Sequence, residues 1–202
     1  MSKHFDQWKH DALSSDKEDL SRKHSIDDYI VDLIQFINNH PDYYTSSSCS
    51  GRTLVFTSTA VVKSTTKSDC QWLYVTHEQA DLQAILSCLE QRSKDIDMIS
   101  IKFEAFILHI SCRTLESGKA LLNIALECGY RNSGLVMSNQ GKITLAVRST
   151  HALEVPIVID GQLSVDENYI TKIVSIANEK MTANLGKIDK FRLTVENKLK
   201  TT

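Results

Sequence analysis

The sequence lacks the features that mark membrane-spanning, secreted and low-complexity proteins. No apolar run approaches the roughly 18 residues that a membrane-spanning helix needs. Residues 1–6 are polar and contain an acid, so they have the character of neither a secretory signal nor a transit peptide. Only two prolines and seven glycines occur in 202 residues, and we therefore expect no long linker.

Cysteines are also few. The five cysteines are an odd number, they are scattered, and they include no Cys-x-x-Cys pair. This pattern argues against a disulfide framework and a zinc ribbon, and it favours the reduced thiols of the cytosol or nucleus. No two histidines have the helical His-x-x-x-His spacing, so we expect no metal site. The prediction is a cytoplasmic protein.

Charge of one sign does not dominate. The net charge is −2, so the whole chain does not attract nucleic acid by its field alone. The distribution is uneven, because residues 1–40 are acidic while residues 102–148 and the C-terminal tail are basic. Such a pattern permits one phosphate-facing surface, although composition alone favours ordinary solvated charge.

Hydrophobic spacing predicts helices alternating with short strands. The helices are expected at residues 5–13, 25–38, 77–92, 114–128 and from 166 onward. The strands are expected at 53–57, 72–75, 99–106, 107–110, 135–137 and 143–147, with a polar hairpin loop at 63–69 and a turn at 139–142. Because hairpins join several strands, we predict an α+β fold with a mixed, mostly antiparallel sheet and packed helices. One compact domain over 1–202 is expected, with a faint two-part repeat at roughly 43–95 and 99–180.

The most unusual stretch is a run of small polar residues that ends in an arginine: Ser46, Ser47, Ser48, Cys49, Ser50, Gly51 and Arg52. We expect a curled loop between a helix and a strand, whose N–H groups, hydroxyls and guanidinium hold a carboxylate or phosphate. A polar connection around a buried cysteine is the alternative. No Gly-x-Gly-x-x-Gly motif follows any strand, so a Rossmann-type methyltransferase fold is unsupported.

Three titratable residues stand at positions suited to acid–base work. His77 follows a predicted strand, His109 lies within one, and Glu104 interrupts an apolar run. Structural roles are the alternative for both histidines. Glu104 either pairs with a base such as Arg113 or serves a site. A hydrolase that uses Cys49 or Ser48 is a further hypothesis, although Gly-x-Ser-x-Gly is missing.

An ordered set of motifs resembles one known family along nearly the whole chain. It comprises Asp-Leu-Ser-Arg-Lys at 19–23, Tyr-Thr-Ser-Ser-Ser-Cys-Ser-Gly-Arg at 44–52, Trp-Leu-Tyr-Val-Thr-His at 72–77, Lys-Phe-Glu at 102–104, Phe-Ile-Leu-His-Ile at 106–110, Cys-Arg at 112–113, Tyr-Arg-Asn-Ser-Gly at 130–134, Ala-Val-Arg-Ser-Thr-His at 146–151, Leu-Glu-Val-Pro at 153–156 and Ala-Asn at 177–178. On these motifs the chain resembles the tRNA wybutosine-synthesizing protein 3 family. His24, Ala105 and Gly118 depart from the residues usual there, which are glycine, proline and alanine.

The resemblance implies an S-adenosylmethionine-dependent methyltransferase without a Rossmann fold. Its implied substrate is the wyosine-type purine 3′ of the anticodon in the anticodon stem-loop of tRNA(Phe), methylated at N4. A non-catalytic tRNA-binding module of the same pathway is the alternative. We predict that residues 46–52 and Trp72 bind the cofactor, although a core role for Trp72 stays open. The candidate general bases are His77, Glu104 and His109, and the candidate tRNA contacts are Arg113, Arg131, Ser133, Gly134, Arg148 and His151.

Overall fold

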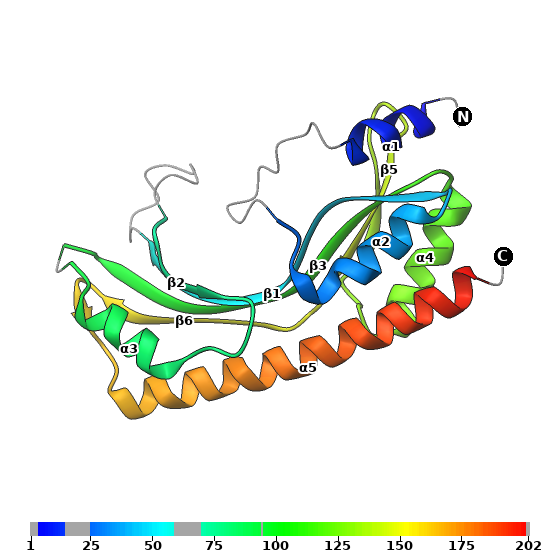
Figure 1. Cartoon of the computed structure of the whole chain (residues 1–202). Coiled ribbons are helices and arrows are strands. Elements are labelled where there is room, and N and C mark those ends of the chain that lie inside the picture. Colours follow the sequence, from blue (N-terminus) through cyan, green and yellow to red (C-terminus); the bar gives the residue numbers. More distant parts are fainter. Residues whose placement is uncertain (1–3, 15–24, 59–69, 94, 201–202) are drawn as a thin grey trace. The chain divides into compact units, whose positions relative to one another are not determined.

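The computed structural model describes residues 4–14, 25–58, 70–93 and 95–200. It divides into two compact units: residues 1–50, 106–150 and 185–202 form unit 1, and residues 51–105 and 151–184 form unit 2. The elements, labelled in Figure 1, are α1 (Phe5–Leu13), η1 (Asp28–Ile30), α2 (Val31–Asn39), β1 (Tyr43–Ser58), β2 (Trp72–Thr76), α3 (Leu82–Glu90), β3 (Met98–Cys112), α4 (Leu115–Glu127), β4 (Gly134–Met137), β5 (Ile143–Arg148), β6 (Ala152–Ile159), β7 (Gln162–Leu163) and α5 (Glu167–Leu199). Three of them, β1, β3 and α5, contribute residues to both units. No helix among the described residues is long and apolar enough to cross a membrane.

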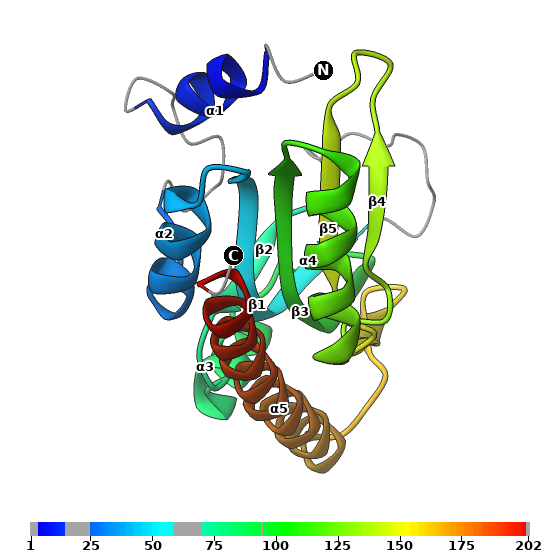
Figure 2. The same cartoon turned by 90° about the vertical axis from the view of Figure 1, so that its right-hand side faces the viewer.

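In unit 1 the strands lie in the order β1-β3-β5-β4. β5 pairs antiparallel with β3, with Leu108 opposite Val147, and with β4, with Leu135 opposite Leu145. α4 lies over this end of the sheet, as Figure 2 shows. Thr114 caps α4 through a reciprocal capping box with Ser117.

The core of unit 1 is formed by side chains of α2, β3, α4, β5 and the C-terminal part of α5. At its centre Phe106, Tyr130 and Phe191 pack as an aromatic cluster, with ring centroids 5.5 to 6.3 Å apart. Each of these rings is almost completely buried. Aromatic burial of this extent is a main source of stability in a small core.

In unit 2 the strands lie in the order β2-β1-β3-β6-β7. Its core contains Val55, Ile85, Ile101, Ile157 and Ile173, which come from β1, α3, β3, β6 and α5. Asn178 of α5 joins the chain ahead of α3, because its amide accepts from Ala80 N at 2.7 Å and donates to Ala80 O at 3.0 Å. The Asn178 of the Ala-Asn motif therefore has a structural role, because it forms hydrogen bonds with both backbone polar groups of Ala80, just ahead of α3.

The predicted α+β class is confirmed, and every strand pair whose register is resolved is antiparallel. The helices 5–13 and 114–128, the hairpin around 139–142 and the long last helix are confirmed almost to the residue. The helix predicted at 77–92 begins only at Leu82, where Asp81 caps it by accepting from Gln83 N and Ala84 N. The predicted loop at 63–69, the motif at 19–23 and His24 lie outside the described residues. The single domain and its two-part repeat stay predictions.

Two predictions for the sheet were wrong. Residues 99–110 lie in one strand, β3, and not in two: residues 99–104 pair with β6, with a register shift between Ile99 and Ser100, and residues 107–112 pair with β5. The predicted serine loop is not a loop, since residues 46–52 lie inside the 16-residue strand β1. Serine carries no strong strand propensity, and here long-range pairing decides the backbone conformation. The only left-handed residue of this segment is Gly51, with a φ of 109°, a conformation that favours glycine.

Candidate functional site

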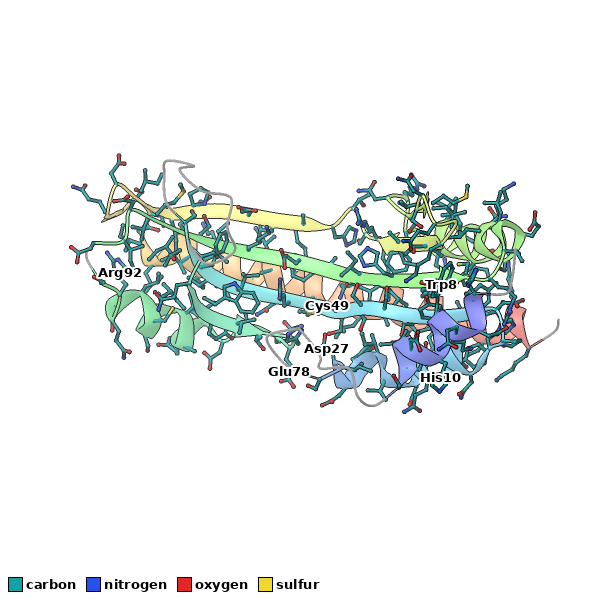
Figure 3. The ribbon with its side chains drawn as sticks, turned by 90° about the horizontal axis from the view of Figure 1, so that it is seen from above. Trp8, His10, Asp27, Cys49, Glu78 and Arg92 are labelled. Carbon is teal, nitrogen blue, oxygen red and sulfur yellow. The ribbon has the colours of Figure 1, made fainter. Side chains whose placement is uncertain are left out.

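The serine segment in unit 1 is anchored by a buried carboxylate. Asp27 is 6% exposed, and its Oδ2 accepts from both Ser50 N at 2.7 Å and Ser50 Oγ at 3.0 Å. Figure 3 shows Asp27 beside the part of β1 that carries Cys49. Ser46 and Ser47 are exposed on the same strand, whereas Ser48 and Cys49 are half-buried. The segment therefore offers hydroxyls from a fixed strand.

Asp27 is a residue that the sequence analysis did not single out. The helix predicted at 25–38 begins only with η1 at Asp28, and the Asp27 side chain makes no capping hydrogen bond to it. Its acceptor is used by Ser50, which lies 23 residues away in the chain.

His109 lies on β3 between two groups of unit 1. Its Nδ1 is 2.8 Å from Ser47 Oγ, and its Nε2 is 3.3 Å from Arg148 Nη2. A guanidinium can only donate, so Nε2 is the acceptor and neutral His109 carries its proton on Nδ1, donating to Ser47. Burial, and then the charge of Arg148, lower the pKa of His109. The structure thus brings together Ser47, a predicted cofactor residue, His109, a predicted base, and Arg148, a predicted tRNA contact.

The other end of the segment belongs to unit 2, where Arg52 is paired. Its Nε and Nη2 both lie 2.7 Å from Glu104 Oε2. Lys102 Nζ lies 3.4 Å from the second oxygen of Glu104 and 3.0 Å from Glu154 Oε2. Burial lowers the pKa of Lys102, but Glu154 and Glu104 outweigh it, so that the pKa is raised.

This network corrects two expectations. Glu104 pairs with Arg52 and Lys102, and not with the suggested Arg113. The Arg52 guanidinium was expected to hold a carboxylate or phosphate of a ligand. Its side-on edge, formed by Nε and Nη2, is instead occupied by Glu104. Both oxygens of Glu104 therefore face cations.

His77 and Trp72 stand at the two ends of β2 in unit 2. The Arg52 guanidinium lies 4.6 Å from the ring centroid of Trp72, at cation–π distance. His77 Nδ1 lies 3.0 Å from the carbonyl oxygen of Gly51. A carbonyl only accepts, so Nδ1 carries the proton of neutral His77 and Nε2 holds the lone pair. A backbone carbonyl that fixes the tautomer in this way suits a histidine that accepts protons at Nε2.

The predicted tRNA contacts lie mostly around the β4–β5 hairpin. Ser133 Oγ accepts from the backbone N of Arg148 at 3.1 Å, which ties the start of β4 to the end of β5. Arg131 and Arg148 are exposed, and Gly134 is the first residue of β4. His151 belongs to the other unit, unit 2, where it is half-buried.

Comparisons with known proteins decide the family. The model of the family described as Methyltransferase TYW3 matches residues 7–197. The chain belongs to this family. A tRNA wybutosine-synthesizing protein 3 homolog from Danio rerio is 40% identical over 187 residues, covering 93% of this chain and 72% of that protein. A Thermococcus sibiricus protein is 33% identical over 189 residues, covering 94% of this chain and 93% of its own length; it is named tRNA(Phe) 7-((3-amino-3-carboxypropyl)-4-demethylwyosine(37)-N(4))-methyltransferase.

The fold is shared with a solved structure of archaeal origin. The protein PH1069 from Pyrococcus horikoshii superposes with a TM-score of 0.84 at 29% identity, covering 96% of this chain and 97% of that chain. Membership of the TYW3 methyltransferase family agrees with the resemblance seen in the sequence motifs. The open antiparallel sheet also agrees with the expectation that this methyltransferase does not use a Rossmann fold.

Arg113 has a different environment from the other tRNA candidates of this TYW3 family member. Its guanidinium contacts Asp6 at 2.5 Å, Asp42 at 2.9 Å and the carbonyl of Pro41 at 2.9 Å, and it lies 4.5 Å from the ring centroid of Phe5. The hydrogen bonds that Arg113 donates to Asp6 are the main cause that raises the pKa of Arg113. A cation surrounded in this way anchors α1, and it is poorly placed to bind a phosphate as well.

Replacing Arg113 by glutamine should therefore loosen α1 more than it weakens RNA binding. Hydrogen exchange of the α1 amides should speed up about tenfold or more, since local opening follows the contacts that hold an element. Arg131→Gln, which removes an exposed arginine of the same unit, is the matched control and should leave α1 exchange unchanged. If Arg113→Gln leaves the exchange of the α1 amides as slow as in the wild type but greatly weakens RNA binding, Arg113 is a tRNA contact after all.

The lowered pKa of His109 predicts a pH dependence of stability. In the unfolded chain its pKa returns toward about 6.5, so the unfolded state binds more protons as the pH falls. The contribution of His109 is then fully present above the unfolded pKa, and it is lost as the pH falls toward the folded pKa. His109→Gln should flatten the fall of Tm between about pH 7.5 and 5. The exposed His10→Gln is the control, and an unchanged slope in His109→Gln would refute the assignment.

Proposed function

We propose that this protein transfers a methyl group from S-adenosylmethionine to N4 of the 4-demethylwyosine-type nucleoside 3′ of the anticodon in tRNA(Phe). The observation that carries the proposal is the near end-to-end match with the Thermococcus sibiricus methyltransferase, over 94% of this chain and 93% of that protein. The TYW3 family membership supports the same reaction class. The five free cysteines fit a reducing compartment, and we place the reaction in the cytoplasm.

The chemistry requires an in-line displacement at the methyl carbon. The bond from that carbon to the donor sulfur breaks, its electron pair stays on sulfur, and the lone pair of N4 forms the new C–N bond. The proton of N4 must leave, so a base at hydrogen-bond distance assists the reaction. Alignment of donor and acceptor supplies the rest of the rate acceleration, and no covalent enzyme intermediate is needed.

We propose His77 as the proton acceptor. Its Nδ1–H donates to the Gly51 carbonyl, which holds Nε2 as the basic nitrogen. His109 Nε2 faces the guanidinium of Arg148 instead, and Glu104 is bound to two cations. His109 then acts by holding Ser47 in a fixed orientation on β1, at 2.8 Å.

The residues of the serine segment fit an anionic donor group only in part. The Ser46 and Ser47 hydroxyls are exposed, so they can donate to the carboxylate of S-adenosylmethionine. Arg52 fits this task less well because Glu104 takes its side-on edge. Its place over Trp72 suggests that it orients the indole for stacking on a planar ring.

The test is incubation of the purified chain with S-adenosylmethionine labelled in its methyl group and tRNA from a strain blocked at the preceding step. Nucleoside mass spectrometry should show the label on the tricyclic base and on no other nucleoside. A non-catalytic tRNA-binding module would bind this tRNA but show no heat of S-adenosylmethionine binding in calorimetry. That combination would reject the proposal.

A further inference from the structure

Unit 2 carries a hollow that none of the candidate residues line. It has a volume of about 280 Å³ and lies beside β2 and the C-terminal end of α3. Leu73 and Ile96 form apolar walls, while Gln71, Gln91 and Ser93 add amides and a hydroxyl. A hollow of this size and mixed lining is suited to a small ligand with a flat apolar face and a polar edge.

Arg92 gives the hollow its charge. Figure 3 labels Arg92 near the end of α3. Its Nη1 donates to the carbonyl of Leu89 at 2.6 Å, which fixes the guanidinium against the helix C-terminus. Its Nε is buried and has no hydrogen-bond partner among the described residues. A group this buried is out of reach of a ligand, so Nη2 is the donor that the guanidinium can offer to one.

The geometry of the guanidinium indicates the ligand. With Nη1 bound to Leu89 and Nε buried, Nη2 is the nitrogen left for a ligand, and its N–H groups can make charge-assisted hydrogen bonds to a phosphate oxygen. Cys88, also in the lining, donates its thiol to Ile85 O at 3.0 Å. Burial raises the pKa of Cys88, so the thiol adds no negative charge to oppose an anion.

We propose that this hollow binds one nucleotide of the substrate tRNA, with its phosphate on Nη2 of Arg92 and its base between Leu73 and Ile96. The amides of Gln71 and Gln91 then face the polar edge of the base. The proposal rests on the proposed function for the identity of the RNA. It places a tRNA contact in unit 2, separate from the arginines around the β4–β5 hairpin.

Affinity for tRNA gives the first test. Arg92→Gln should weaken binding roughly tenfold, as expected for one charge-assisted contact, and reduce the slope of log affinity against log salt by about one. The kcat at saturating tRNA should be unchanged. Lys172→Gln, which removes one exposed charge of unit 2, is the matched control and should change neither quantity. Equal effects of the two variants would overturn the proposal.

A direct measurement keeps the test independent of folding. In wild-type protein the NMR signal of Arg92 Nε–H, assigned through its loss in Arg92→Lys, should shift with adenosine monophosphate and with an anticodon stem-loop oligonucleotide. Adenosine alone should move it little. An equal response to inorganic phosphate and adenosine monophosphate would show a simple phosphate site and refute the nucleotide. No response to any of them would refute the site.

The two proposals fail in different ways. If the chain does not methylate tRNA but Arg92 responds to the oligonucleotide, the proposed function is wrong and the RNA contact stands. If the chain methylates tRNA and Arg92 does not respond, the reaction stands and the contact is wrong.

Discussion

Replacing His77 by glutamine should lower kcat by about 10²- to 10⁴-fold, the range that a general base typically contributes. Glutamine can still donate to the Gly51 carbonyl, which His77 Nδ1 contacts at 3.0 Å, but it cannot accept a proton. The melting temperature should therefore change little, because the hydrogen bond to the Gly51 carbonyl can be kept. Single-turnover methylation with labelled S-adenosylmethionine measures the chemical step.

The control for His77 is His10, whose side chain is 78% exposed on α1. His10→Gln should leave kcat within about twofold, as expected for a surface substitution. The acid limb of the pH–rate profile should vanish in His77→Gln, because the wild-type limb reports protonation of the base. A rise in KM with kcat intact would instead mean that His77 only binds substrate.

Replacing Asp27 by alanine should destabilise the protein by about 3 kcal/mol, since two hydrogen bonds to a charged acceptor are lost and a buried N–H is left unpaired. For a chain of this size that corresponds to a fall in Tm of roughly 6 to 12 °C. Ser50 is 1% exposed, so water does not readily replace the lost acceptor. Thermal unfolding followed by circular dichroism measures the effect.

Two variants show whether the Asp27 effect arises from its contacts with Ser50. Asp28→Ala removes the exposed neighbouring carboxylate and should change stability by less than about 0.5 kcal/mol. Asp27→Asn keeps an acceptor oxygen but removes the charge, so its loss of stability should lie between those of Asp28→Ala and Asp27→Ala. If Asp27→Ala melts within a degree or two of the wild type, the carboxylate does not hold β1.

In the serine segment the composition is visible in the sequence, whereas the backbone conformation depends on contacts with distant residues. Its composition, four serines around a cysteine followed by Gly51 and Arg52, was conspicuous in the sequence. Its conformation was misread, because small polar residues are typical of loops when they are judged alone. The hydrogen bonds that fix it come from Asp27, at a separation of 23 residues, and from strand pairing across the sheet.

Residues 114–129 illustrate the opposite case. The capping box at Thr114, the leucines of α4 and the left-handed Gly129, with a φ of 89°, lie close together in the chain. Each acts on the helix turn next to it, so the pattern predicts the helix and both ends. The hairpin around Gly141 was found for the same reason, because a tight turn depends on its own few residues.

The sequence by itself determined the family, the α+β class and most helices, because ordered motifs, helix caps and turn residues act over a few positions. Only the tertiary structure decided which polar groups meet. Arg52 pairs with Glu104 across 52 residues, and Arg113 pairs with Asp6 across 107. The first pair exists because the neighbouring strands β1 and β3 bring Arg52 and Glu104 together, and the second because helix α1 packs beside the residue that follows β3. Residue types in sequence order carry no record of that register, so the roles of Arg52, Glu104 and Arg113 became visible only in the fold.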